Sequence, residues 1–200
     1  MQREDDRKRD KDVIPLRDPF GLPMRIRDLT RRWVAESLEF STSKSLAIRE
    51  AIISDIGNLL QDEPNNEAAW LCLADIAEVS GDRLLRIYCI AQTLHHNPSN
   101  TEALIGLASI GMDLARPVVE VKRLLESALA AMQRCGYRCE LLEIMLGLAW
   151  GAGLCELYNA LRREGKAHFP LEDWDWLEKD GVTSKKVNYV STKERGDEFK

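Results

Sequence analysis

The side chains with the greatest capacity for chemistry in this 200-residue chain are three histidines and five cysteines. His95 and His96 are neighbours in a helical segment, where adjacent side chains diverge by about 100° and cannot easily share a metal ion. The segment Cys135-Gly-Tyr-Arg-Cys139 has the spacing of half a zinc site, but no second Cys or His pair follows it. We therefore expect no metal here, while a redox role for Cys135 and Cys139 stays open.

Other signatures of catalysis are missing from the sequence. It contains no Gly-rich phosphate loop, no serine nucleophile elbow and no metalloprotease histidine pair. Acidic groups such as Glu172, Asp173 and Asp175 fit a charged surface better than an acid/base pair. We predict that the protein is not an enzyme and uses no cofactor.

Composition narrows the class of partner. The net charge of −5 argues against a dominant nucleic-acid surface, which would need clustered Lys and Arg. No stretch is long and apolar enough to span a membrane, and residues 1–12 are polar or charged after Met1, unlike a secretory signal. With an odd number of cysteines, which fits reduced thiols, these features predict a cytoplasmic protein.

The elements expected to position these residues are helices. Residues 1–24 contain Pro15, Pro19 and Pro23 and are predicted to be a flexible arm. Residues 25–166 show the 3.6-residue hydrophobic period of about eight helices, and no strand is expected before Val187–Val190. Residues 167–200 are predicted to be an acidic-aromatic capping segment followed by a mobile tail. The helices are separated by breaks at 64–66, 80–82, 97–100, 116–117, 135–137 and 151–153.

Two of these helical segments repeat each other. DEPNNEAAWLCLAD (62–75) and HNPSNTEALIGLAS (96–109) align with Pro64 and Pro98, Trp70 and Leu104, and Ala74 and Ala108 each 34 residues apart. With this helix–turn–helix period the chain resembles the tetratricopeptide repeat (TPR) family, in the degenerate form common in bacterial proteins. Arg86 departs from the family pattern, which has Ala at that position. The resemblance implies an all-α fold, a right-handed α-solenoid of stacked helix-turn-helix hairpins.

The resemblance also implies a binding surface. In the family's geometry the first helix of each pair lines a concave groove, which is acidic with apolar patches in this chain and suits a basic or amphipathic protein segment. We therefore expect an adaptor or assembly factor that binds another protein. The predicted partner-binding residues are Leu71, Asp75, Glu78, Val79, Ile105, Ser109 and Met112, with Glu102 beside them.

Two further segments leave alternatives open. Leu171, Trp174 and Leu177 are spaced to cap the last hairpin, but Trp174, Trp176 and Leu177 could instead dock on another protein, which would make the chain a permanent subunit of a larger complex. A basic cluster either binds anionic surfaces or nucleic acid, or is a solvated helix face with Trp33 packed inward. The cluster comprises Arg25, Arg27, Arg31 and Arg32. The sequence does not specify an oligomeric state.

Overall fold

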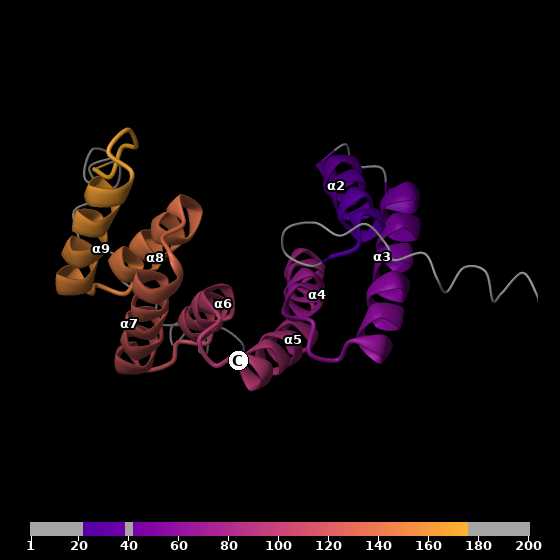
Figure 1. Ribbon diagram of the computed structural model, residues 1–200, viewed down its shortest axis with the longest axis horizontal. Helices are drawn as coiled ribbons and strands as arrows, with labels where there is room; N and C mark the ends of the chain where they lie inside the picture. Colours follow the sequence, from indigo (N-terminus) through magenta and orange to yellow (C-terminus); the bar gives the residue numbers. More distant parts are fainter. Residues whose placement is uncertain (1–21, 39–41, 176–200) are drawn as a thin grey trace, which may run out of the picture. The chain divides into compact units, whose positions relative to one another are not determined.

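A computed structural model describes residues 22–38 and 42–175 of the chain (Figure 1). These residues form eight α-helices and no β-strand, which confirms the predicted all-α class. The arm predicted at 1–24 lies almost wholly outside them, as do the tail after residue 175 and the segment Val187–Val190. The helices are α2 (Met24–Leu38), α3 (Thr42–Asp62), α4 (Glu67–Val79), α5 (Arg83–His96), α6 (Thr101–Asp113), α7 (Val118–Cys135), α8 (Cys139–Gly151) and α9 (Cys155–His168).

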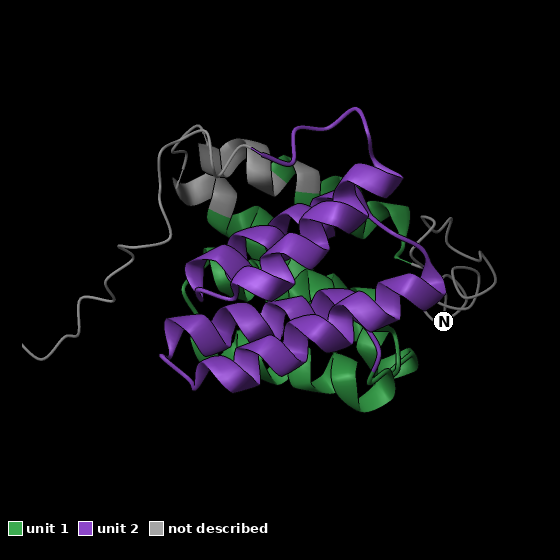
Figure 2. Cartoon of the chain, turned by 90° about the vertical axis from the view of Figure 1, so that its left-hand side faces the viewer, with its two compact units in different colours: residues 1–98 green, residues 99–200 purple. Residues whose placement is uncertain are grey.

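The chain divides into two compact units, residues 1–98 and residues 99–200, coloured separately in Figure 2. In unit 1, α2 packs on α3 and α4 packs on α5, with α3 also against α4. In unit 2, α6 packs on α7 and α8 packs on α9, with α6 also against α8. Each unit is therefore built from pairs of helices that follow each other in the sequence and pack together.

Side-chain caps fix where the two repeated helices begin. The side-chain Oδ1 of Asn66 accepts a hydrogen bond from the Ala69 amide at 3.0 Å, and that of Asn100 accepts one from the Ala103 amide at 2.9 Å. Each cap satisfies one of the amide groups that a helix leaves unpaired at its start. Because the two asparagines are 34 residues apart, α4 and α6 begin in the same repeat register and have the same length of 13 residues.

A shared turn fixes where three helices end. The residues that follow α4, α6 and α8 by two positions are left-handed: Gly81 (φ +71°), Ala115 (φ +49°) and Gly153 (φ +69°). At each turn the next amide reaches back five residues, a closure typical of helix C-termini. These hydrogen bonds run from Asp82 to Ala77 (2.8 Å), from Arg116 to Gly111 (2.8 Å) and from Leu154 to Ala149 (2.9 Å). The α8–α9 hairpin thus repeats the design of α4–α5 and α6–α7.

Apolar faces of the helices meet within each unit. In unit 1 the core joins α2, α3 and α4 through residues such as Ile26, Ile52 and Ile76. In unit 2, Leu125 of α7, Leu142 of α8 and Leu161 of α9 are fully buried. Within the described residues, no helix combines the length and the apolar character that crossing a membrane requires.

Candidate interaction surface

The predicted contacts on α4 lie along its solvent-facing side. Asp75 and Glu78 are exposed, and Val79 at the end of the helix is 64% exposed. Leu71 is half-buried, one turn before Asp75. Ala69, Ile76 and Ala77 on the other side of α4 are buried, as are Cys72 and Ala74 at the edges of the exposed side. The helix therefore separates a packed face from an acidic face that carries one exposed aliphatic group, and this acidic face is the strongest candidate site in unit 1.

An arginine that the repeat pattern does not predict supports this face. The Nη2 atom of Arg86, on α5, lies 2.9 Å from Oε1 of Glu78. The Arg86 side chain is only 12% exposed while that of Glu78 is 51% exposed, so the arginine stem packs between the helices and its charge reaches the rim. Arg86 therefore holds Glu78 in place and neutralises part of the acidic field. In the sequence, Arg86 was marked only by its position, where the TPR pattern has Ala.

The residues predicted on α6 belong to unit 2, and they differ in accessibility. Ile105 is 4% exposed and belongs to the core. Ser109 and Met112 are half-buried, and the Met112 methyl group lies 3.4 Å from the point where a Cβ on Gly151 of α8 would be. We therefore treat Ile105 as a packing residue and leave it out of the contact surface proposed below, because packing within the chain already covers its side chain.

The end of the described chain folds back on α9. Trp174 is 2% exposed, and its indole N–H donates to the carbonyl of Phe169 at 2.9 Å. The ring lies so close to Gly165 that a Cβ there would be 2.4 Å from it. Leu171, expected to pack beside Trp174, is instead 97% exposed, because the turn after Phe169 directs only the tryptophan onto the helix. Trp176 and Leu177 lie outside the described residues.

Ion pairs hold the same segment. Asp175 accepts hydrogen bonds from Arg162 and, at 3.0 Å, from Lys166, both on α9. These hydrogen bonds, first that of Arg162 and then that of Lys166, lower the pKa of Asp175 to about 2. Trp174 and Asp175 thus act as an apolar and a charged anchor on one helix face. Packing over α9 is the role of Trp174 in this structure.

The basic cluster of α2 is partly neutralised. Arg25 pairs with Asp55 of α3 through Nε and Oδ2 at 2.9 Å, although the Arg25 side chain is 76% exposed. Arg27 is half-buried and Arg32 is exposed. The side chains of Arg31 and of Trp33 lie outside the described residues. The pair with Asp55 reduces the positive field that an anionic surface would meet.

The histidines and cysteines form no metal site among the residues that the structure describes. His95 and His96 occupy the last turn of α5, a position where basic side chains are common because the helix dipole favours them. Cys135 is exposed at the end of α7, and Cys139 is half-buried at the start of α8. Burial and the carboxylates of Glu143, Glu172 and Glu140 raise the pKa of Cys139, which disfavours the reactive thiolate.

Known proteins provide no further guide to this surface. Comparison of the chain with protein-family models, curated proteins and solved structures gave no match. The functional argument therefore depends on the chain's own residues.

Proposed function

We propose that this protein is a cytoplasmic adaptor or assembly factor, a degenerate TPR-like protein whose hairpins stack as a right-handed solenoid. Its α4 face would bind a basic or amphipathic segment of another protein. The recurrence of one hairpin turn after α4, α6 and α8 supports the repeat design. A hairpin with one apolar face gains stability by stacking on its neighbours, which is the physical basis of solenoids.

The observation that carries the binding proposal is the pair of exposed carboxylates on α4. Asp75 and Glu78 are three residues apart, so their side chains project from the same side of the helix. A basic segment would gain charge complementarity there, and the neighbouring Val79 would add apolar contact. If the hairpins stack as proposed, Ser109 and Met112 would extend this surface.

The two alternative functions receive less support from the contacts. A permanent subunit that used Trp174 and Trp176 as its seam would first have to release the Trp174 side chain, which is 2% exposed. An anion-binding accessory that used Arg25 would compete with the Arg25–Asp55 pair. The acidic face of α4 requires no buried ring to be released, and a basic partner there would share Glu78 with Arg86.

The test compares charge variants of α4 for binding to a partner retrieved from the native host on the tagged chain and then purified. Asp75→Asn with Glu78→Gln removes two exposed charges, each worth about 0.2–1 kcal/mol. Affinity should fall between about twofold and thirtyfold, mostly through the association rate. Arg86→Met should act in the opposite direction, because it leaves Glu78 without its countercharge.

The matched control is Glu140→Gln with Glu143→Gln on α8. These two carboxylates are also exposed and also three residues apart. They change the net charge of the chain by the same amount, so they report the general electrostatic effect. Equal association rates for the α4 variant and the α8 control would refute the α4 binding site.

A further inference from the structure

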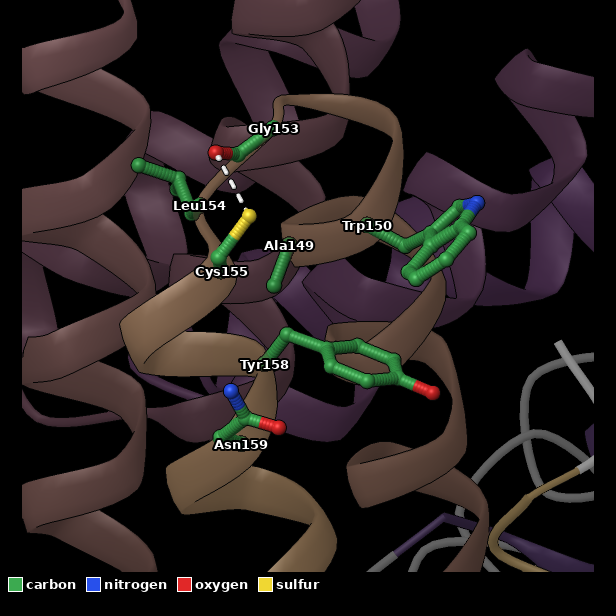
Figure 3. Close-up of a pocket in the computed structure, with 7 residues that line it drawn as sticks. All are labelled: Ala149, Trp150, Gly153, Leu154, Cys155, Tyr158 and Asn159. Atoms are coloured by element: carbon green, nitrogen blue, oxygen red, sulfur yellow. Dashed lines mark hydrogen bonds between the residues drawn. The ribbon is translucent and has the colours of Figure 1, made fainter. Parts of the chain in front are cut away.

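A cavity of about 130 Å³ lies at the turn between α8 and α9, within unit 2 (Figure 3). The rings of Trp150 and Tyr158 form one wall, with centroids 5.0 Å apart and planes inclined by 54°. Ala149, which is fully buried, lines the interior. Cys155 and Asn159 also line the cavity and are exposed, one helical turn apart on α9, so they mark its opening.

The α8–α9 hairpin turn creates this space. Gly153 takes the left-handed conformation, and the Leu154 amide closes the turn on the Ala149 carbonyl. This closure starts α9 beside the last turn of α8, where the two aromatic rings meet. The Tyr158 ring is 3% exposed and is held by its packing. The buried indole N–H of Trp150 has no hydrogen-bond acceptor among the described residues, so no such bond restrains that ring.

The lining defines the chemistry of a ligand. Two inclined aromatic rings favour a third ring in an offset or edge-to-face arrangement. A cavity of about 150 Å³ is known to hold benzene, so the volume here suits one six-membered ring and little more. The Asn159 carboxamide at the opening can donate or accept one hydrogen bond. We infer that this cavity is a binding site for a monocyclic aromatic group with one polar substituent, such as a phenol.

Cys155 provides a local reporter of occupancy. Its thiol contacts the Gly153 carbonyl at 3.7 Å and is exposed beside the cavity (Figure 3). The Cys155 thiolate can attack 4,4′-dithiodipyridine, so that the reagent's S–S bond breaks, a mixed disulfide forms on the protein and pyridine-4-thiolate leaves. Cys135, which is exposed at the end of α7, reacts in the same way but lies away from the cavity lining. It is the internal control.

The experiment measures labelling of each cysteine by mass spectrometry in the intact chain, with phenol as the probe and cyclohexanol as a control of similar size without a π face. The affinity that small ligands reach per heavy atom allows phenol a Kd of about 1 mM or tighter. At ten times the Kd it should slow labelling of Cys155 about tenfold and leave Cys135 unchanged. Cyclohexanol should have little effect.

Equal slowing by phenol and cyclohexanol, slowing at both cysteines, or no slowing at Cys155 would overturn the inference. N-acetyltyrosinamide distinguishes the source of the ring. Protection by phenol alone indicates a small molecule, whereas protection by both indicates that the ring can belong to a polypeptide. Because the cavity lies on α8–α9 and the proposed partner surface lies on α4, either site can fail without the other.

Discussion

Replacing Ala115 by Gly should stabilise unit 2, although glycine loses more conformational entropy on folding than any other residue. Ala115 is the only residue other than glycine with a positive φ among those described, and its φ is +49°. The corresponding turns after α4 and α8 use Gly81 and Gly153. The left-handed position of this turn therefore favours glycine, but the α6–α7 hairpin has alanine there.

The magnitude follows from two opposing terms. An L-residue in the left-handed region costs about 1–2 kcal/mol relative to the right-handed one, and glycine avoids that cost. Glycine also gives the unfolded chain more freedom, which costs about 0.4–1 kcal/mol. The difference predicts that Ala115→Gly stabilises by about 0.5–1 kcal/mol. Gly153→Ala should destabilise by a similar amount, since no atom lies within 4 Å of the added methyl group and only the backbone conformation is penalised.

The assay is urea unfolding followed by circular dichroism, with the midpoint and slope fitted for each variant. Ala91, an exposed residue in the middle of α5, provides the control, because Ala→Gly there should destabilise by about 1 kcal/mol. The same substitution should thus have opposite signs at residues 115 and 91. If Ala115→Gly destabilises as much as Ala91→Gly does, the left-handed turn after α6 is not the source of strain.

Two other predictions concern the segment that covers α9. Gly165→Ala should release Trp174, because a methyl group would lie 2.4 Å from the ring, while the better helix propensity of Ala offsets about 1 kcal/mol of the loss. Hydrogen exchange of the Trp174 indole N–H should accelerate, whereas Gly147→Ala, with no atom within 4 Å, should leave it unchanged; unchanged exchange in both variants would contradict the contact. Because its ion pairs lower the pKa of Asp175 from 3.8 to about 2, the stabilisation that they provide is fully present above pH 3.8 and is lost as the pH falls through about 2. In the native chain, protection of the Trp174 indole N–H from exchange should therefore decrease as the pH falls from 3.8 to about 2. In Asp175→Asn the protection should be weaker and should not change over this pH range. Identical pH profiles for the two proteins would exclude Asp175 as the cause of the pH dependence.

Local signals in the sequence predicted the helix boundaries. Each expected break from 64–66 onward lies between two helices of the structure or overlaps the last residue of one, as at Cys135 and Gly151, because caps, turn glycines and prolines act within a few residues of their own position. The 34-residue register also recurs in the structure, since Asn66 and Asn100 cap equivalent helices. Caps and turns depend on residues that are only a few positions apart, so they can be predicted directly from the sequence.

Which face of a helix stays accessible depends on distant residues, and there the sequence was a weaker guide. Ile105 fits a groove position by its repeat register, yet it is 4% exposed. Leu171 fits an amphipathic cap by its spacing, yet it is 97% exposed because the chain turns after Phe169. The cavity beside Trp150 depends on how α8 meets α9, and no spacing in the sequence indicates it.

The Trp174 contact bears on where a partner can bind. A ring that is 2% exposed represents about 3–5 kcal/mol of packing, judged from the usual cost of truncating a buried tryptophan. A partner that used this ring as an anchor would first lose that energy, and one that stacked on α9 would meet a face already covered. The acidic face of α4 requires no comparable opening, since Asp75 and Val79 are exposed in the unbound chain. Binding there uncovers no buried side chain and shares Glu78 with Arg86, so charge substitutions on α4 should change the association rate more than any substitution at Trp174 does.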